Sequence, residues 1–263
     1  MSARFAGSGV IVTGAGQGIG QSVAEAFAAE GAEVLLVGRT PDTLEAEVGR
    51  IASQGGRAWA LQADVSVPAD VDAVVAAASR RWPRIDVLVN NAAVVHEAPF
   101  LEVSDDQWSE VVGIDLTGVF LMSQRVCRAM AGRGGGSVVH IASIDASGAD
   151  GPYVAYNAAK AGLLGLNRTM AVELAELGIR VNAVSPGFTH TAMTESAVTP
   201  EIMDHLLHRF RRVPMRRLVR PAEVAAAVLF LASAEASAIT GTNVIVDCGL
   251  TANLYILETL PTP

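Results

Sequence analysis

Lysine is almost absent from this sequence of 263 residues, which contains eighteen arginines and a single lysine, Lys160. Arginine and lysine serve about equally well on a solvated surface, so a general preference for arginine does not explain why one lysine is kept. Lysine carries a compact point charge with three rotatable donors, whereas arginine carries a wide planar fork. We therefore expect Lys160 to have a role for which a guanidinium is unsuited.

Cysteine, net positive charge and long apolar runs are also lacking. Cys127 and Cys248 are the only cysteines, and neither belongs to a CxxC or Cys/His pattern, which predicts two reduced, buried thiols and no metal site. The formal net charge of -8 and the pI near 5.1 argue against a nucleic-acid partner. Without an apolar run of about eighteen residues or a cleavable leader, we expect a cytoplasmic protein with no membrane partner.

What is present is an alternation of short apolar runs with longer helical patterns. Apolar residues make up 51% of the chain, enough for a substantial core. Because seven runs are almost continuously apolar, they predict a seven-stranded parallel sheet with helices on both faces. The predicted strands are GVIVTG, AEVLLVG, RAWALQAD, IDVLVNN, GSVVHIAS, IRVNAVSPG and NVIVDCG, and the predicted helices span 18–30, 41–54, 68–82, 104–131, 152–177 and 221–233.

No repeat, low-complexity tract or linker divides the chain, so we predict one doubly wound α/β domain over residues 1–263. Segment 188–215 is the longest stretch outside the strand–helix rhythm. It follows the C-terminal end of a strand, where such sheets bind ligands, and is therefore predicted to be a substrate lid. The basic run at 209–220 is interpreted as a solvated helix face and turn, with a docking patch for an acidic partner as the alternative. The tail at 253–263 is apolar enough to cover either a pocket or a subunit interface.

A glycine-rich loop, VTGAGQGIG, joins the first predicted strand to the first predicted helix. Gly14, Gly18 and Gly20 would permit a tight turn, a close approach of backbone to a pyrophosphate, and close packing of the helix on the sheet. The helix N-terminus would supply unpaired N–H groups. This pattern favours a Rossmann-type dinucleotide site over an ordinary glycine turn, and the missing Gly-Lys-Ser/Thr excludes a mononucleotide P-loop.

The end of the second predicted strand bears on which dinucleotide binds. An acidic residue there would accept hydrogen bonds from the adenosine ribose, but this chain has Gly38 and Arg39. Asp42, the nearest acid, is explained by its place in the first turn of a helix that begins after Thr40. A guanidinium can hold a 2′-phosphate, so Arg39 favours NADP over NAD, with a surface arginine as the alternative interpretation.

Tyr156 and Lys160 are four residues apart on a predicted helix and therefore project from one face. A tyrosine with its ordinary pKa near ~10 is a poor proton donor or acceptor at neutral pH. A nearby ammonium favours the phenolate, so we expect Lys160 to lower the pKa of Tyr156. An isolated YxxxK is more often part of an amphipathic helix, but the isolation of Lys160 in an arginine-rich chain favours the chemical role.

Ser143 lies just past the C-terminal end of a predicted strand, in VVHIASIDASG. Its hydroxyl could donate to a substrate carbonyl while Tyr156 delivers a proton, in the manner of an oxyanion stabiliser. A serine at such a place is otherwise a turn residue.

With these residues assembled, the sequence resembles the classical short-chain dehydrogenase/reductase family over nearly its whole length. Five motifs of that family have counterparts in this sequence: the TGxxxGxG loop, an adenine-contacting Asp-Val pair, an NNAG-like segment, a serine thirteen residues before a YxxxK pair, and a PGxxxT segment. They are Thr13 to Gly20, Asp64 and Val65, Asn90 to Ala93, Ser143, Tyr156 and Lys160, and Pro186, Gly187 and Thr191.

The resemblance implies hydride transfer between a nicotinamide and a carbinol or carbonyl carbon. It implies that Tyr156 is the general acid/base, that Ser143 orients the substrate oxygen, and that Lys160 lowers the pKa of Tyr156 and holds the nicotinamide ribose. It also implies the strand order 3-2-1-4-5-6-7 and a homotetramer. The cofactor-binding residues so implied are Gly14, Gln17, Gly18, Ile19, Gly20, Arg39, Asp64, Val65, Asn91, Tyr156, Lys160, Pro186, Gly187, Thr189 and Thr191, and the substrate-binding residues are Ser143, Asp145, Tyr153, Tyr156 and Phe188.

Two positions depart from the family pattern. Asp115, in GIDLTGVF, stands where the family has a catalytic asparagine, and a carboxylate accepts hydrogen bonds without donating any. We expect Asp115 to support a proton relay to Lys160, to favour its cationic form, and to alter the pH dependence of the reaction. Cys248 stands where a glycine is common, and we expect it to be a neutral packing change.

These observations favour an NADP(H)-dependent oxidoreductase that interconverts a ketone and a secondary alcohol of a small or medium-sized metabolite. A narrower alternative is a 3-oxoacyl-carrier-protein reductase whose basic segment docks an acidic carrier. A non-catalytic nucleotide-binding scaffold of the same fold is the third hypothesis, favoured only by Asp115. Further candidates for the pocket wall are Val95, His96, His190 and Met193, although both histidines fit solvated loops equally well.

Overall fold

The computed structural model describes residues 3–149, 151–197, 199–208 and 210–253, without the side chains of Met193, Ser196, Ala197 and His208. The predicted roles of the apolar tail fall on residues that, after Asn253, lie outside this part of the chain.

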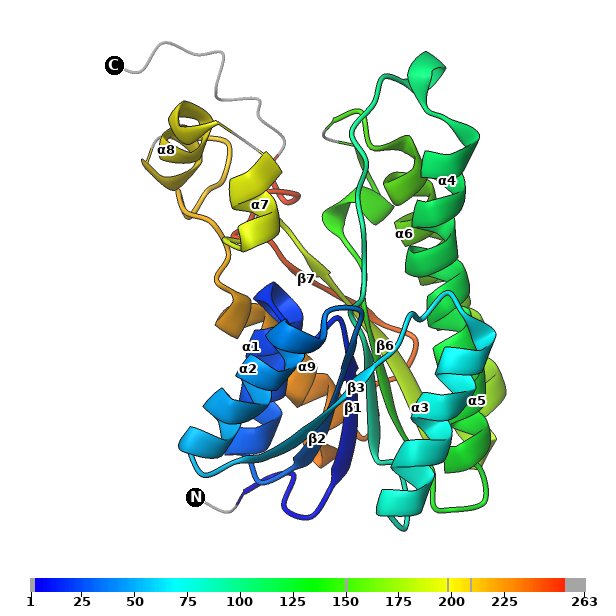
Figure 1. The fold of residues 1–263 in the computed structure, drawn as a ribbon. Helices are drawn as coiled ribbons and strands as arrows, with labels where there is room; N and C mark the ends of the chain where they lie inside the picture. The colour runs from blue at the N-terminus through cyan, green and yellow to red at the C-terminus, as the bar shows by residue number, and fades with distance from the viewer. Residues whose placement is uncertain (1–2, 150, 198, 209, 254–263) are drawn as a thin grey trace.

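All strands of the described chain belong to one parallel seven-stranded sheet in the order β3-β2-β1-β4-β5-β6-β7 (Figure 1). Both the predicted strands and the predicted order are confirmed. The chain returns across the sheet after β3 to place β4 beside β1, and this reversal opens a crevice at the carboxyl edge. The strands are β1 (Gly9–Thr13), β2 (Glu33–Gly38), β3 (Arg57–Gln62), β4 (Val87–Asn90), β5 (Gly136–Ile141), β6 (Ile179–Pro186) and β7 (Asn243–Val246).

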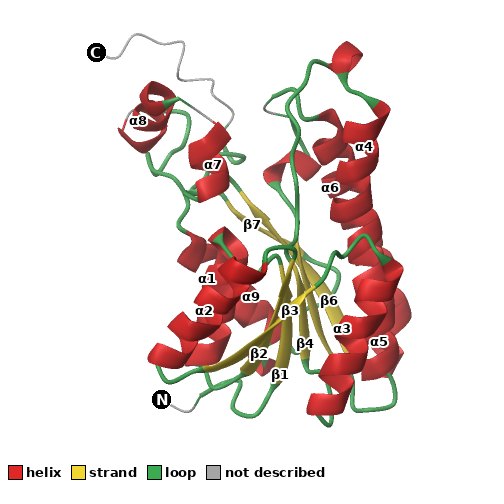
Figure 2. Cartoon of the chain, viewed as in Figure 1, coloured by secondary structure: helices red, strands yellow, loops and turns green. Residues whose placement is uncertain are grey.

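Helices cover both faces of the sheet, as Figures 1 and 2 show. One layer holds α1 (Gly18–Ala29), α2 (Pro41–Ser53) and α9 (Pro221–Ala232), and the other holds α3 (Pro68–Arg81), α4 (Asp105–Val112), α5 (Val119–Met130) and α6 (Val154–Leu174). Successive residues of a strand face opposite layers, so Val10 and Val12 belong to the core under α1 and α9 while Ile11 belongs to the core under α3 and α5. Two covered faces explain the continuous apolar character of the strands.

Local sequence signals place two helix boundaries. Helix α2 follows Thr40 at the N-cap position, with Pro41 in its first turn, although the Thr40 side chain makes no capping hydrogen bond. Helix α6 ends through a short 3₁₀ turn at Gly178, whose φ of 71° is left-handed. Glycine adopts that conformation without the steric cost borne by other residues, so the chain can turn directly into β6.

The helix predicted over 104–131 is not continuous, which corrects the sequence-based expectation. A π-helical turn, Gly113–Gly118, separates α4 from α5. Glycines weaken the α-helix here, and a Cβ on Gly118 would lie 2.8 Å from the Val65 side chain, so the wide turn packs directly against the segment after β3. The same turn carries Asp115 into the interior, where it is fully buried.

Cys248 is also not a neutral packing change. It is half-buried, and its φ of 56° is left-handed, a conformation that costs a side-chain-bearing residue about 1–2 kcal/mol relative to glycine. Its carbonyl accepts a hydrogen bond from the Met215 N–H at 3.2 Å, which ties the chain after β7 to the turn before α9.

Segment 188–215 contains α7 (Ala192–Ala197) and α8 (Pro200–His208), which stand above the carboxyl edge of the sheet opposite α4 (Figure 1). Its base is attached to the fold by a parallel bridge between Thr189 and Val219. No helix among the described residues is both long enough and apolar enough to cross a membrane.

Candidate active site

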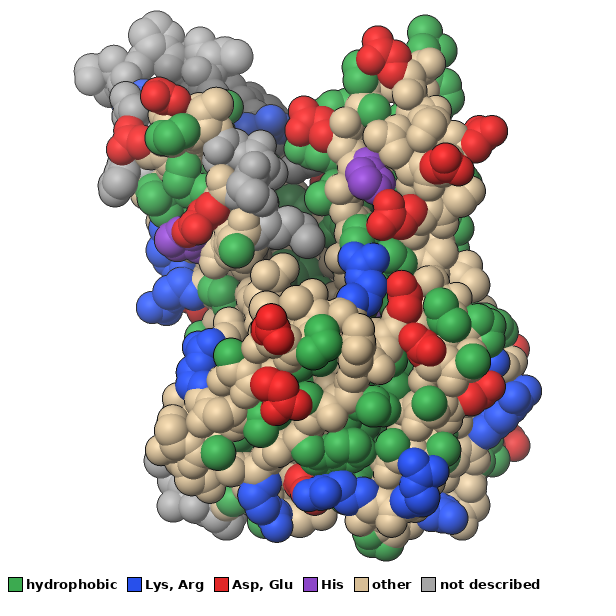
Figure 3. All heavy atoms as spheres, viewed as in Figure 1, with side chains coloured by type: hydrophobic (Ala, Val, Ile, Leu, Met, Phe, Trp, Pro, Cys, Tyr) green, Lys and Arg blue, Asp and Glu red, His purple; other side chains and the backbone are tan. Residues whose placement is uncertain are grey.

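A cleft of about 440 Å³ opens at the carboxyl edge of the sheet, where β1, β2, β4, β5 and β6 end. Figure 3 shows the hollow between the α7–α8 side and the α4 side of the molecule. The cleft is lined by every predicted substrate residue, namely Ser143, Asp145, Tyr153, Tyr156 and Phe188. It is also lined by all predicted cofactor residues except Gly20, namely Gly14, Gln17, Gly18, Ile19, Arg39, Asp64, Val65, Asn91, Tyr156, Lys160, Pro186, Gly187, Thr189 and Thr191.

The glycine loop packs too closely against the segment after β4 and against itself for side chains at Gly14 and Gly20. Gly14 has a left-handed φ of 63°, and a Cβ there would lie 2.8 Å from the Ala92 Cα. Gly20 packs beneath the loop, where a Cβ would collide with the Gly14 carbonyl and the Asn91 side chain, so it supports the cleft without lining it. The Asn91 amide holds the loop by donating to the Thr13 and Gly14 carbonyls at 2.9 and 3.0 Å.

The first turn of α1 is open toward the cleft. Gln17 occupies the N-cap position with no side-chain cap, so its side chain satisfies none of the first N–H groups of the helix. Those donors and the positive end of the helix dipole suit a phosphate. A dinucleotide therefore fits this loop on steric and electrostatic grounds.

Arg39 lies at the other end of the cleft, beside the N-terminus of α2. Its side chain is 53% exposed and forms a long ion pair, 3.8 Å, with Glu110 of α4. Asp42 is exposed and does not line the cleft. The charged group at this end of β2 is thus a cation, as the sequence suggested.

Ser143, Tyr156 and Lys160 meet where β5 ends against α6. Ser143 is 8% exposed, and its hydroxyl acts on the Tyr156 phenol in the direction that lowers the pKa of that phenol. Lys160 is 2% exposed, lies 5.3 Å from the centre of the Tyr156 ring, and donates from Nζ to the Ile141 carbonyl at 3.1 Å. The three residues therefore form one polar cluster at the floor of the cleft.

Asp115 lies behind this cluster and does not line the cleft. Its Oδ2 is 3.2 Å from Lys160 Nζ, and its Oδ1 accepts a hydrogen bond from the Val94 N–H at 2.9 Å. Burial raises the pKa of Asp115, against the opposing effect of Lys160. Burial alone would lower the pKa of Lys160, but the Asp115 carboxylate and the Tyr156 phenol outweigh it, and the pKa of Lys160 is raised. The lysine is therefore a firmly protonated cation.

The pKa of Tyr156 is raised in this structure, whereas the sequence led us to expect that Lys160 would lower it. Burial is the largest cause, and Asp115 and Asp145 add to it. Lys160 does act in the expected direction, as does Ser143, but burial acts more strongly than either of them. The expected effect of Lys160 is therefore confirmed, but the net pKa is raised because the expectation left out the desolvation of the phenolate and the nearby carboxylates.

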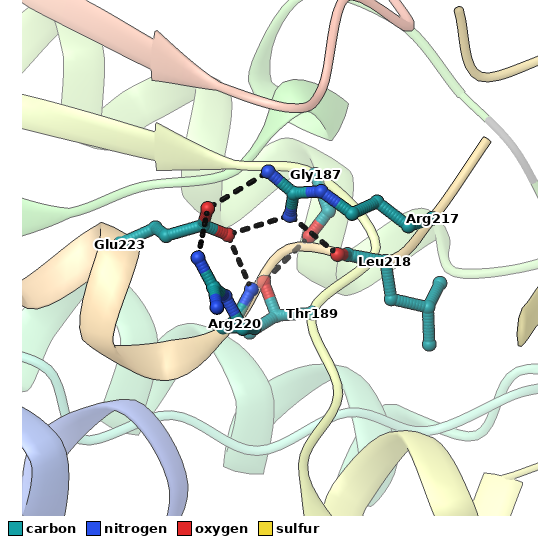
Figure 4. A network of polar contacts seen from close by, with 6 residues as sticks. All are labelled: Gly187, Thr189, Arg217, Leu218, Arg220 and Glu223. Atoms are coloured by element: carbon teal, nitrogen blue, oxygen red, sulfur yellow. Dashed lines mark hydrogen bonds and ion pairs between the residues drawn. The ribbon is translucent and has the colours of Figure 1, made fainter. Parts of the chain in front are cut away.

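A charge network fixes the turn between segment 188–215 and α9, as Figure 4 shows. Arg217 donates to both oxygens of Glu223 at 2.8 Å, and Arg220 adds a contact at 3.0 Å and a backbone hydrogen bond at 2.9 Å. These bonds hold the pKa of Glu223 down at about 2. Two arginines of the basic run thus fasten the start of α9, in agreement with the interpretation as a surface turn.

Of the remaining candidates for the pocket wall, some line the cleft and others do not. Val95 lines the cleft, whereas His96 and His190 pair with Glu110 and Glu195 at 2.7 and 2.8 Å and do not line it. The Met193 side chain lies outside the described part of the chain.

Sequence reasoning missed most of the apolar lining. The segment after β4 could have been found, because it follows the carboxyl end of a central strand. Leu206, by contrast, reaches the cleft only through the path of segment 188–215. The missed residues include Ala92, Ala93, Val94, Ile114, Ala142, Ile144, Ala192, Thr194 and Leu206.

Comparison with known proteins agrees with this geometry. A family model described as enoyl-(acyl carrier protein) reductase matches residues 14–251. Oxidoreductase UcpA of Escherichia coli K12 is 38% identical over 94% of this chain and 96% of its own. A 3-oxoacyl-[acyl-carrier-protein] reductase of Synechocystis sp. is 37% identical over 91% of this chain and 95% of its own.

A solved structure from Beutenbergia cavernae superposes with a TM-score of 0.90, at 35% identity, covering 96% of this chain and all of that one. It is provisionally described as an NAD(P) dependent gluconate 5-dehydrogenase and contains NADP at low occupancy. Fold and site together define a nicotinamide-nucleotide-dependent oxidoreductase. The chain belongs to the short-chain dehydrogenase/reductase family, and it is an NAD(P)-dependent enzyme acting on CH–OH groups.

Proposed function

We propose that this enzyme interconverts a ketone and a secondary alcohol of a small or medium-sized metabolite, with NADP(H) as the favoured cofactor and NAD(H) as the alternative. The cluster of Ser143, Tyr156 and Lys160 on the floor of the cleft carries the proposal. The bound nicotinamide supplies the hydride in reduction and accepts it in oxidation. Everything else in the reaction falls to side chains of this chain.

Ser143 donates a hydrogen bond to the carbonyl oxygen and so orients and polarises it. Tyr156 gives its phenolic proton to that oxygen as the carbonyl carbon accepts the hydride, and takes the proton back in the oxidation direction. Lys160 holds a positive charge beside the phenol and the nicotinamide ribose. Asp115 supports Lys160 from behind.

The cleft divides between cofactor and substrate. We assign the glycine loop and the N-terminus of α1 to the pyrophosphate, Asp64 and Val65 to the adenine, and Arg39 to a 2′-phosphate. The segment Pro186 to Thr191 would contact the nicotinamide. The substrate would contact Asp145, Tyr153 and Phe188, and segment 188–215 would cover it as a lid. Residues 1–263 would form a single domain.

A narrower candidate is a 3-oxoacyl-carrier-protein reductase, because a relative with that name is 37% identical over 91% of the chain. In that case Arg212 and Arg216 of the basic run would dock the acidic carrier. Charge-neutralising substitutions of both would slow reduction of a carrier-bound ketone without slowing that of the free ketone. Equal effects on both substrates would exclude docking.

Consumption of NADPH and NADH with a panel of ketones tests the proposal, with the Tyr156→Phe variant beside the wild type. We expect the wild type to turn over at least one ketone. The variant should lose at least about 100-fold in kcat, because general acid catalysis is removed, and should still bind NADPH in a fluorescence titration. Equal rates in both proteins would contradict the role of Tyr156, whereas no turnover of any ketone by the wild type would support the scaffold hypothesis.

A further inference from the structure

The most unusual group near the site is a carboxylate sealed in the interior. Asp115 is fully buried, and Oδ2 has no hydrogen-bond partner among the described residues, so the ammonium of Lys160 at 3.2 Å is its main electrostatic compensation. A buried carboxylate is tolerated only when it is paired in this way. The π-helical turn and the Val94 N–H fix its position.

This carboxylate changes the field at Tyr156. A lone ammonium would draw a proton off the phenol, whereas an ammonium with a carboxylate beside it is close to a neutral dipole. An asparagine of the same shape would leave the positive charge of Lys160 uncancelled. The difference between the two side chains is therefore one unit of charge at almost unchanged geometry.

The other titratable groups around the phenol do not supply a substitute for Asp115. His140 of β5 is fully buried and neutral, since burial and Lys160 lower its pKa to about 3. Asp145, in the 3₁₀ turn after Ser143, is a second acid that acts on Tyr156, but it lines the open cleft. Among the described residues, Asp115 is the acid that is paired directly with Lys160.

We propose that Asp115 is a built-in counter-ion for Lys160 that keeps Tyr156 in its protonated, proton-donating form at neutral pH. The enzyme is then poised for carbonyl reduction near neutrality, and alcohol oxidation, which needs the phenolate, proceeds only in more alkaline solution. Asp115 is a positioning residue, because it acts through Lys160 and does not reach the cleft. The predicted pH dependence of reduction and oxidation rests on the proposed function, whereas the pairing of Asp115 with Lys160 is a property of the folded chain.

The composition of the chain offers a direct readout. Lys160 is its only lysine, so protein grown on lysine labelled with ¹³C at Cε gives a single side-chain resonance that reports the protonation of Lys160. The chain has three tyrosines, and subtracting the ultraviolet pH titration of Tyr156→Phe isolates the Tyr156 phenolate. Neither measurement requires turnover.

The test compares wild type, Asp115→Asn and, as a matched charge removal away from the lysine, Asp145→Asn. In Asp115→Asn we expect both Lys160 and Tyr156 to titrate about 1 pH unit or more below their wild-type positions, and the alkaline rise of alcohol oxidation to move down equally. In Asp145→Asn we expect Lys160 to stay in place. Unchanged titrations of Lys160 and Tyr156 in Asp115→Asn would contradict the proposal that Asp115 is the counter-ion of Lys160.

If the titrations of Lys160 and Tyr156 shift in Asp115→Asn but the pH profile of alcohol oxidation does not, the role of Asp115 as counter-ion is supported. The role of Tyr156 in the proposed function is then contradicted. The wild type gives an answer even if Asp115→Asn does not fold. A paired Lys160 must hold its proton above the ordinary lysine value of ~10.4. A wild-type resonance that titrates below that value would overturn the proposal.

Discussion

At the scale of single residues, the oddity of one lysine among eighteen arginines has a structural explanation. Lys160 is 2% exposed and its ammonium is confined between Asp115, the Ile141 carbonyl and the Tyr156 ring. A compact ammonium can interact with all three groups at once, whereas a guanidinium is planar and wider. The surface can use arginine throughout because it makes no such demand.

Replacing Lys160 with arginine should therefore remove activity although the charge is kept. We expect kcat/KM of Lys160→Arg to fall at least about 100-fold, because the guanidinium cannot occupy the site without displacing Tyr156 or Asp115. Steady-state kinetics measure the loss, and circular dichroism checks the fold. The matched control is Arg168→Lys, an exposed position on the same helix, which should keep wild-type rates. Full activity in Lys160→Arg would refute the geometric argument.

We propose that Arg39 sets the preference of the enzyme for NADP(H). Its exposed guanidinium at the end of β2 should form charge-assisted hydrogen bonds with a 2′-phosphate, so we expect Arg39→Ala to weaken NADPH binding about 10-fold or more. NADH binding should change less than about threefold, since its ribose carries no phosphate. Fluorescence titrations with both nucleotides measure this, and Glu110→Gln, which frees Arg39 from a weak ion pair, is the control. Equal losses for both nucleotides would contradict an NADP preference.

At the scale of helices, strands and turns, the sequence predicted the features that depend on neighbouring residues. The seven strands, the glycine loop and the left-handed Gly178 each follow from neighbouring residues. The π-helical turn does not, because it forms where Gly118 meets Val65, 53 positions away in the chain but in contact in the fold. Likewise, the raised pKa of Tyr156 depends on burial, which no spacing of residues reveals.

The contact between α1 and α2 contains a buried acid that should make stability depend on pH. Glu47 is fully buried, accepts from Gln21 at 2.7 Å, and pairs with Arg50 at 2.9 Å. Burial, and then Glu25, raise its pKa to about 7. The folded state thus binds this proton more tightly than the unfolded state, so its stabilising effect is full below about pH 4.5 and is lost as the pH rises through about 7.

We expect the free energy of unfolding to fall between about pH 5 and pH 8 by an amount on the order of 1–3 kcal/mol from this group. Glu47→Gln should remove that part of the decline. Urea denaturation at several pH values measures it, with Glu45→Gln, an exposed position on the same helix, as the control. A decline that is equally steep in Glu47→Gln and in the wild type would show that another group is responsible.

At the scale of the whole molecule, α5 and α6 are among the helices that present apolar side chains outward. Val172 of α6 is 78% exposed and Phe120 of α5 is 44% exposed, in a layer whose helices also carry the small residues Ala158, Ala161 and Gly162 on their surface. Exposed apolar groups beside small residues suit close helix packing between subunits. We propose that this face forms an interface of the homotetramer that the family resemblance implies.

An interface on this face should be sensitive to a single charge. We expect Val172→Glu to shift the mass measured by light scattering after gel filtration to a smaller assembly. Ala46→Glu, an exposed position on α2 in the opposite layer, should leave the mass unchanged. A wild-type protein that elutes as a monomer would contradict the interface outright.

Transfer of the hydride itself tests the central claim most directly. Wild-type enzyme is incubated with a ketone that it turns over and with reduced cofactor in which both hydrogens at C4 of the nicotinamide are deuterium. The alcohol is analysed by mass spectrometry, with Tyr156→Phe as the control. The account predicts one deuterium on the carbinol carbon in the wild-type product and little product from the variant. An alcohol without deuterium, or equal product from both proteins, would contradict it.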